Sequence, residues 1–404
     1  MKKTCIFLII MILIITTGCQ KDVFQSISHG VSGSWPSFRG GPTHSGLSKY
    51  RGQGRGEIKW KYNTGGPIIS SPALPGGGKV YFGSNDDYIY SVFGQGELDW
   101  KYKTGDDVIS SPCVMPGGGC SVGSADKNLY CLNSDGTLNF VFPTKGAIFS
   151  SPVLDESGRL IFGSNDGNLY CISRDGNLLW KYSVGDSIMS SPAITTGGDI
   201  LFGSEDYCFY CVSSDGRLKW KVRTWLEVSG SALVVPDGGI FWGSCDCYFY
   251  GLSPDGTIKW KVLAGNAVVG SPAISPAGDV IYYTVSWLES PPAEGGKANF
   301  PVLFAIDRQG NILWSFKGPA GMSGSPLVDS AGNIYILDDK SMFYALDRDG
   351  KLLWKINLWG KNDRPSRFDV DTSLDIFASS PSMGKDGTIY VGSGDGSLYA
   401  IGKL

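Results

Sequence analysis

The apolar positions of the chain fall into short runs that repeat as one unit of about 40 residues, complete between Leu178 and Gly216. Four runs rich in β-branched and aromatic residues make up each unit, and Gly, Asp-Gly or Pro-Gly pairs separate them. One position marks the register in the successive units: Pro72, Pro112, Pro152, Pro192, Ala232, Pro272, Pro326 and Pro381. A repeat at a fixed period indicates a repeat architecture of eight like units.

Each unit reads as four antiparallel strands. Pairs such as Asp175-Gly176 and Asp215-Gly216 stand between apolar runs, where a tight hairpin turn needs a positive φ. Helical spacing and helix caps do not occur in the units, which argues against a helical or leucine-rich solenoid. Four strands in about 40 residues describe one blade of a β-propeller. The sequence therefore predicts an all-β, eight-bladed propeller.

The two ends of the repeat predict how the ring closes. The first strand-like segment, Glu57 to Tyr62, stands alone, and the last unit ends after its third strand, Leu398 to Ile401. We expect the first segment to complete the last blade, because closure removes the open strand edges that invite aggregation.

Charge excludes one class of partner. The 404 residues carry a net charge of −3, without a basic stripe or a run of like charges. A nucleic-acid partner is therefore not expected.

The N-terminus reads as an export signal. Lys2 and Lys3 precede an apolar stretch from Cys5 to Ile15, which is short for a membrane span and ends at Thr16-Thr17-Gly18-Cys19. This end resembles a bacterial lipobox, with Thr16 where the family has Leu. The resemblance implies a signal peptide over residues 1–18, a lipid such as palmitate on Cys19, a tether over 19–34 and a propeller over 35–404. An ordinary secretory signal is the alternative.

The blades resemble the pyrroloquinoline-quinone (PQQ) type of propeller. Trp35-Pro-Ser-Phe-Arg-Gly-Gly-Pro-Thr-His44 is similar to the segment that precedes the blades in that family. Ala305 to Trp314 and Ala345 to Trp354 look like its tryptophan-docking motif, one residue shorter and without its threonine. The resemblance covers residues 35–404 and implies the fold rather than one activity.

Three repeated residue types have structural explanations. The aromatic that opens each unit is expected to pack on the next blade; the series is Trp60, Trp100, Phe140, Trp180, Trp220, Trp260, Trp314 and Trp354. Cys131, Cys171 and Cys211 are expected to be small buried residues beneath it. An aspartate recurs between the second and third strands, at Asp86, Asp126, Asp166, Asp206, Asp246 and Asp395. We interpret these aspartates as turn residues that bond nearby backbone rather than as a ring of cation ligands.

Cysteines and histidines give no metal signature. His29 and His44 both precede the blades, and zinc spacing is absent. Cys113 and Cys120 could face each other across a hairpin, so pairing in an oxidising compartment stays open. Cys208 is expected near the same rim as Cys245 and Cys247 of the next blade, where a metal site is the alternative to unliganded thiols. Glycine runs are expected at hairpin tips, because no phosphate-binding loop context surrounds them.

Two insertions predict a recognition surface. Ser286 to Phe300 enlarges the turn between strands two and three of blade six, and Asn357 to Ile376 enlarges the link between blades seven and eight. Both fall on one face of the ring, and aromatic residues in long loops favour binding. The candidate binding residues are Trp225, Trp287, Trp359, Arg364, Arg367, Phe368 and Asp371. The alternative is that these loops plug the channel or pack on the rim.

Two functions from different classes follow. The first is a non-catalytic lipoprotein, lipid-anchored in the cell envelope, where we expect the outer membrane, and facing the periplasm or the surface. It would bind an envelope protein or polysaccharide as a monomer or in a hetero-complex, and would resemble the outer-membrane assembly propeller lipoproteins. The second is a dehydrogenase using PQQ and calcium; such enzymes carry adjacent cysteines that this chain lacks, so no cofactor is expected. A lyase or hydrolase using Asp369, Asp371 or Asp375 in the funnel is a third possibility.

Overall fold

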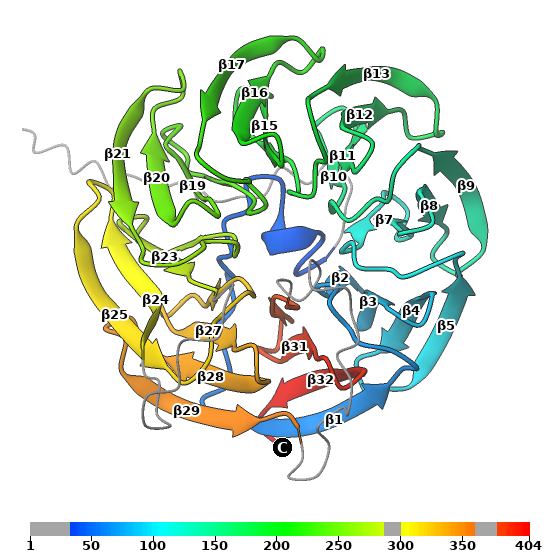
Figure 1. Ribbon diagram of the computed structural model, residues 1–404. Coiled ribbons are helices and arrows are strands. Elements are labelled where there is room, and N and C mark those ends of the chain that lie inside the picture. The colour runs from blue at the N-terminus through cyan, green and yellow to red at the C-terminus, as the bar shows by residue number, and fades with distance from the viewer. Residues whose placement is uncertain (1–32, 287–299, 360–377) are drawn as a thin grey trace, which may run out of the picture.

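The computed structural model describes residues 33–286, 300–359 and 378–404, and shows eight four-stranded sheets around one axis (Figure 1). Neighbouring strands within each sheet are antiparallel, as in the pairings of blade 4. A three-residue 3-10 helix is the only helix among the described residues, and none of them forms a helix that could cross a membrane. The predicted eight-bladed β-propeller is confirmed.

The strands of blades 1–4 are β2 (Ala73–Gly76), β3 (Lys79–Ser84), β4 (Tyr88–Phe93), β5 (Leu98–Lys103); β6 (Cys113–Val114), β7 (Cys120–Gly123), β8 (Asn128–Leu132), β9 (Leu138–Pro143); β10 (Val153–Leu154), β11 (Leu160–Ser164), β12 (Asn168–Ile172), β13 (Leu178–Ser183); β14 (Ala193–Ile194), β15 (Ile200–Ser204), β16 (Cys208–Val212) and β17 (Leu218–Arg223). Those of blades 5–8 are β18 (Leu233–Val234), β19 (Ile240–Gly243), β20 (Tyr248–Leu252), β21 (Ile258–Leu263); β22 (Ala273–Ile274), β23 (Val280–Thr284), β24 (Phe300–Asp307), β25 (Ile312–Gly318); β26 (Leu327–Val328), β27 (Ile334–Leu337), β28 (Met342–Leu346), β29 (Leu352–Asn357); β30 (Ser382–Met383), β31 (Ile389–Gly392), β32 (Ser397–Gly402) and β1 (Glu57–Asn63).

Blade 8 contains both ends of the repeat. Its sheet order is β1-β32-β31-β30, with β1 pairing antiparallel to β32. Trp60 lies opposite Ala400, and Asn63 lies opposite Ser397. The first strand of the ring is therefore the outer strand of its last blade.

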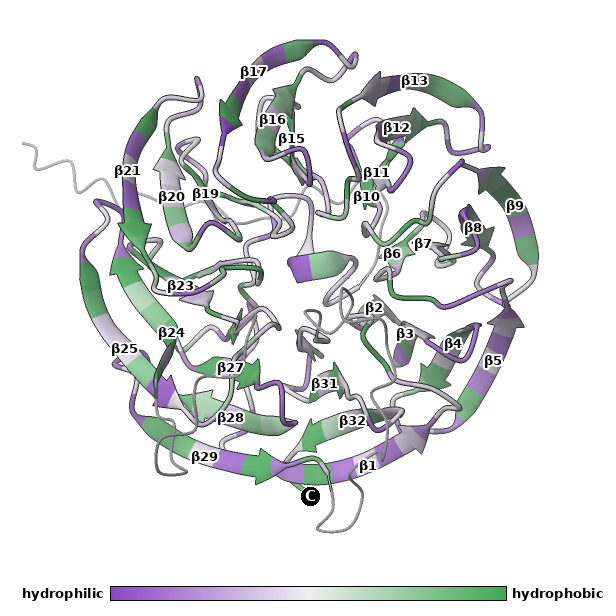
Figure 2. Ribbon diagram, viewed as in Figure 1, coloured by the Kyte–Doolittle hydropathy of each residue, from purple (hydrophilic) through white to green (hydrophobic). Residues whose placement is uncertain are grey.

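Burial decreases from the axis to the rim of each blade. The middle strands β15 and β16 are buried along their whole length, because both of their faces pack against neighbouring blades. The outer strand β17 alternates between exposed and half-buried positions. Figure 2 shows polar and apolar bands along the outer strands.

The outer-strand aromatic residues, seven tryptophans and Phe140, join each blade to the next, as the sequence predicts. Trp180 of blade 3 donates from Nε1 to the carbonyl of Ser214 in blade 4, over 3.1 Å. Its ring lies against Gly216, where a Cβ would come within 2.7 Å of the indole and where φ is +82°. Glycine is required there both for the turn and for the close approach. Trp60, Trp100, Trp220, Trp260 and Trp314 make the same type of hydrogen bond.

The residues before β1 cross one face of the ring as an extended strap, Trp35 to Gln53. The strap includes η1 (Phe38–Gly40), the dark blue turn at the centre of Figure 1. We call the face that the strap crosses, which holds the β-turns between strands one and two and between three and four, the strap face. The opposite face holds the turns between strands two and three and the links between blades, and we call it the mouth face.

Two basic side chains of the strap are buried without a carboxylate partner among the described residues. Arg39 is 1% exposed and donates from Nη2 to the carbonyl of Pro272 over 2.9 Å, while its Nε and Nη1 have no partner among the described residues. Burial lowers the pKa of Arg39 to about 9. His44 is also 1% exposed; burial, and then the charge of Arg39, lower its pKa to about 3, against a smaller opposing effect of a hydrogen bond with the Ala232 backbone. His44 is therefore neutral when the chain is folded.

Candidate binding site at the mouth of the propeller

Eight serines form a closed ring of hydrogen bonds around the axis. The Oγ of each accepts a hydrogen bond of 2.8–3.3 Å from the backbone N–H of the equivalent serine in the preceding blade. The link from Ser380 to Ser71, at 3.0 Å, joins the last blade to the first. The members are Ser71, Ser111, Ser151, Ser191, Ser231, Ser271, Ser325 and Ser380.

A cup of about 70 Å³ lies on the axis inside this ring. Phe38 of the strap contributes to its lining, and the serine hydroxyls line its wall. The residue two positions before each ring serine forms a collar that is bulky in blades 1–4 and smaller in blades 5–8: Ile69, Ile109, Phe149 and Met189, then Ser229, Val269, Ser323 and Ala378. This volume accommodates a few waters or one small group.

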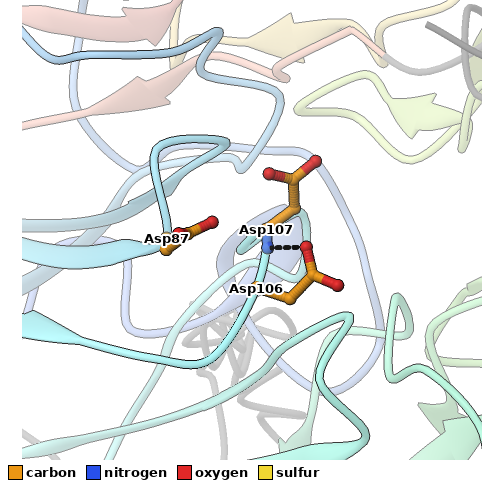
Figure 3. A group of neighbouring side chains, drawn as sticks. All are labelled: Asp87, Asp106 and Asp107. Carbon is orange, nitrogen blue, oxygen red and sulfur yellow. Dashed lines mark hydrogen bonds between the residues drawn. The ribbon is translucent and has the colours of Figure 1, made fainter.

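Carboxylates cluster at the mouth between blades 1 and 2. Asp87 lies in a turn of blade 1, and Asp106 and Asp107 lie in the link to blade 2 (Figure 3). One carboxylate oxygen from each lies within 4.8 Å of the others, and Asp106 Oδ1 accepts a hydrogen bond from the N–H of Asp107 over 2.9 Å. Burial, and then repulsion by Asp106, Asp87 and Asp86, raise the pKa of Asp107 to about 6. The cluster therefore gives the mouth a negative potential.

A second acidic group lies between blades 4 and 5. Burial raises the pKa of Glu205, and the charges of Asp186 and Glu227 raise it further against a hydrogen bond from Ser187. Like charges disfavour ionisation only where they lie close together. The mouth is therefore acidic in two separate sectors.

The repeated aspartates are turn residues, as predicted. Asp206 Oδ1 accepts a hydrogen bond from the N–H of Cys208, and its Oδ2 accepts one from the N–H of Gly185 in the preceding link. Asp86, Asp126, Asp166 and Asp246 bond the same two backbone positions.

Each of these turns also has a tyrosine partner that sequence reasoning missed. Tyr210 donates from its hydroxyl to Asp206 Oδ2 over 2.6 Å. Burial, followed by this hydrogen bond and the aspartate charge, raises the tyrosine pKa. The sequence does carry a signal for this hydrogen bond, because a tyrosine stands four residues after every one of these aspartates. The aspartates are Asp86, Asp126, Asp166, Asp206, Asp246 and Asp395.

Trp225 is an exposed aromatic side chain at a turn position that does not require one. Its backbone N–H donates to Asp246 Oδ2 over 3.3 Å, just as Gly105 donates to Asp126 and Gly185 to Asp206. The side chain is 81% exposed. Two other exposed apolar residues, Tyr207 and Leu226, belong to the same sector of the mouth face, because Thr224 Oγ1 donates to the carbonyls of both.

Trp359 packs against blade 8 rather than extending freely into solvent. Its Nε1 donates to Ser393 Oγ over 3.0 Å, and the side chain is half-buried. The other candidate residues lie outside the described residues: Cys19, Trp287, Arg364, Arg367, Phe368 and Asp371.

The eight cysteines of the described residues are all unpaired. Cys113 and Cys120 do not face each other, since Cys120 pairs with Val114 across the hairpin. Cys131, Cys171 and Cys211 are buried opposite the outer-strand aromatics Phe140, Trp180 and Trp220, as expected. Burial raises the pKa of Cys131 to about 11 and that of Cys171 to about 12, so these thiols stay protonated and inert.

Eight blades joined by outer-strand tryptophans define the PQQ-like class of β-propeller. Within that class, the sequence matches the family of the outer membrane protein assembly factor BamB over residues 51–187, 165–297 and 254–403. The chain belongs to this family. A search of curated proteins finds no match.

Solved structures from two functional groups share the fold. BamB from Moraxella catarrhalis is 14% identical with a TM-score of 0.68, over 86% of this chain and 100% of its own. A europium-containing methanol dehydrogenase is 12% identical with a TM-score of 0.72, over 92% and 98%. Quinohemoprotein alcohol dehydrogenase from Comamonas testosteroni is 12% identical with a TM-score of 0.73, over 92% and 81%. At these identities the likeness shows the fold alone.

Proposed function

We propose that this protein is a non-catalytic binding module of the cell envelope that docks a partner, an envelope protein or a glycan, on its mouth face. The family name supports a role in a protein assembly at the outer membrane. The observation that carries the proposal is the exposure of Trp225, because most of the indole contacts solvent at a position that holds glycine or lysine in the five other links of regular spacing, at Gly65, Gly105, Lys145, Gly185 and Gly265.

An exposed tryptophan between acidic groups suits an interface. Tryptophan is enriched among the residues that dominate binding energy, since its ring buries a large apolar area at a small entropic cost. Glu205 and Glu227 lie in the same sector and would favour a partner surface with basic groups. Trp359, Trp287, Arg364, Arg367, Phe368 and Asp371 belong to the same proposed surface.

The proposal includes a lipid anchor on Cys19. The anchor would hold the propeller at a membrane, facing the periplasm or the surface. Metabolic labelling with a palmitate analogue should mark the native chain but not the Cys19→Ser variant. Equal labelling of both chains would remove the anchor from the proposal.

The dehydrogenase alternative is less well supported. The residues that line the axial cup supply hydroxyls and apolar groups, without a carboxylate for a calcium ion. The cup of about 70 Å³ is also small for a tricyclic quinone. We expect the purified protein mixed with PQQ and calcium to gain no stoichiometric quinone absorbance and to oxidise neither alcohols nor sugars; the opposite result would favour the enzyme.

Site-specific photo-crosslinking tests the binding proposal. A photoreactive phenylalanine at position 225 should crosslink one defined envelope partner, and Trp225→Ala should weaken binding of that purified partner about tenfold or more. Leu313, 51% exposed on the outer strand β25, is the matched control for an exposed apolar residue. Equal crosslinking from positions 225 and 313, or an unchanged affinity of Trp225→Ala, would contradict the mouth face as the docking site. Trimming residues 287–299 and 360–377 tests the contribution of the insertions.

A further inference from the structure

The strap satisfies the same backbone group in most blades. The second residue of the innermost strand directs its backbone N–H away from its own sheet. A backbone carbonyl of the strap accepts a hydrogen bond from this N–H. Ile194 of blade 4 donates to Pro42 over 2.7 Å, and Val234 of blade 5 donates to Thr43 over 3.0 Å. The equivalent residues of blades 1, 2, 6 and 7, which are Leu74, Val114, Ile274 and Val328, donate to Trp35, Pro36, Ser45 and Gly46.

Blade 3 is one of two exceptions among the blades. Asp155 pairs with Arg159 across the β10–β11 hairpin, so the N–H of Leu154 points away from β11. No strap carbonyl reaches it, because the strap turns toward the axis through η1 between Pro36 and Pro42. The N–H instead meets the Sγ of Cys113, a weak acceptor. Met383 of blade 8 also lacks a strap carbonyl, but it is fully buried, whereas Leu154 is partly exposed.

A pocket of about 220 Å³ opens beside Leu154. It lies between the hairpin tips of blades 3 and 4, and Pro42 of the strap lines it at the point where the strap bonds the innermost strand of blade 4. Leu154, Ile194 and Pro42 contribute apolar lining, and the exposed Thr196 and Glu156 contribute polar lining.

The two carboxylates that line the pocket differ in their ion pairing. Asp155 is paired with Arg159 at 2.6 Å. The exposed carboxylate of Glu156 forms no ion pair with any residue that the structure describes. A side chain with an apolar stem and a cationic tip would complement both the apolar lining and this carboxylate.

We call the N–H of Leu154 and the pocket beside it the seat. We infer that an extended segment of a partner polypeptide occupies this seat. One of its carbonyls accepts the N–H of Leu154, and a neighbouring Lys or Arg side chain enters the pocket toward Glu156. The occupant is polypeptide because the chain's own extended backbone fills the same seat on blades 1, 2 and 4–7. Strand addition of this kind draws affinity from main-chain hydrogen bonds and selectivity from a side-chain pocket. The seat lies on the strap face, so it is independent of the proposed mouth-face function.

Selection of unstructured 12-residue peptides displayed on phage against the full chain tests the inference, with affinities measured by fluorescence anisotropy. Lys- or Arg-containing peptides should be enriched. Leu154→Pro removes the N–H at an edge position that tolerates proline, and Thr196→Trp fills the pocket without touching the backbone. Each should weaken the selected peptides at least about tenfold, and Glu156→Gln should weaken them less and reduce the preference for basic residues.

Lys385→Trp is the matched control, because Lys385 is the equivalent exposed residue at the hairpin tip of blade 8. It should leave the peptide affinity unchanged, and thermal melting should confirm that every variant folds. Failure to enrich any peptide, or equal affinity of the native, Leu154→Pro and Thr196→Trp chains, would overturn the inference. Self-association of the native chain that Thr196→Trp abolishes would instead identify a second copy as the occupant and would refute a separate partner.

Discussion

The strap face and the mouth face differ in how their polar groups are satisfied. On the strap face, carbonyls of one segment accept hydrogen bonds from backbone N–H groups of six blades, and the buried basic residues Arg39 and His44 have no carboxylate partner among the described residues. On the mouth face, the aspartate turns bond the backbone of the preceding link, and the exposed Trp225 shares its sector with the carboxylates of Glu205 and Glu227. The strap face is therefore built by long-range contacts that stabilise the ring. The mouth face consists of self-contained turns whose outward side chains are free to vary.

The docking tryptophans should show the largest stability effect. Trp180→Ala removes the ring from Gly216 and the hydrogen bond to Ser214. We expect a loss of about 3 kcal/mol in the free energy of unfolding, measured by urea denaturation. A loss below about 1 kcal/mol would show that blade contacts other than the tryptophan hold neighbouring blades together.

Acid should lower the free energy of unfolding through His44 on the strap face. Its folded-state pKa of about 3 lies below the ordinary value of 6.5, so below pH 6.5 the unfolded chain binds a proton that the folded chain rejects. The stability associated with neutral His44 is therefore full above pH 6.5 and is lost as the pH falls toward 3, on the order of 1 kcal/mol per pH unit.

His44→Asn should lose less stability over that range. Asn also tolerates the positive φ of 53° at this position. Urea denaturation at intervals from pH 7 to pH 4 measures the difference between the two slopes. Parallel slopes for the native chain and His44→Asn would mean that another group carries the acid sensitivity.

A mouth-face turn should contribute less than a docking tryptophan. Tyr170→Phe removes the hydroxyl that donates to Asp166 Oδ2 over 2.7 Å. Asp166 keeps its bonds to the N–H groups of Lys145 and Asn168, so we expect a loss of about 1 kcal/mol by urea denaturation. A loss as large as that of Trp180→Ala would contradict the independence of these turns.

Trp225→Ala should give the smallest stability effect. The indole is 81% exposed, and the hydrogen bond of the residue uses only its backbone. We expect the free energy of unfolding to change by no more than about 0.5 kcal/mol. A larger loss would show that Trp225 serves the fold, and it would remove the main support for a recognition role.

The repeat predicted the fold because each unit contains all the local sequence signals that define a blade. Apolar alternation, Asp-Gly turns and a docking aromatic are local signals, and their recurrence fixed the number of blades, the turn role of Asp206 and the burial of Cys171. The serine ring was also present in the sequence, as a serine before every register position. Its meaning was missed because a hydrogen bond between residues 40 apart has no local signature.

Only the tertiary structure decided which of the eight equivalent positions differ. The strap carries no repeat, so nothing in its sequence indicates that it caps Ile194 yet bypasses Leu154. The burial of Arg39 and the exposure of Trp225 likewise depend on neighbours that closure of the ring brings together. The sequence by itself determined the repeated blade, because its contacts are local or lie one unit away. The departures from symmetry, which hold the candidate sites, follow from contacts between distant segments.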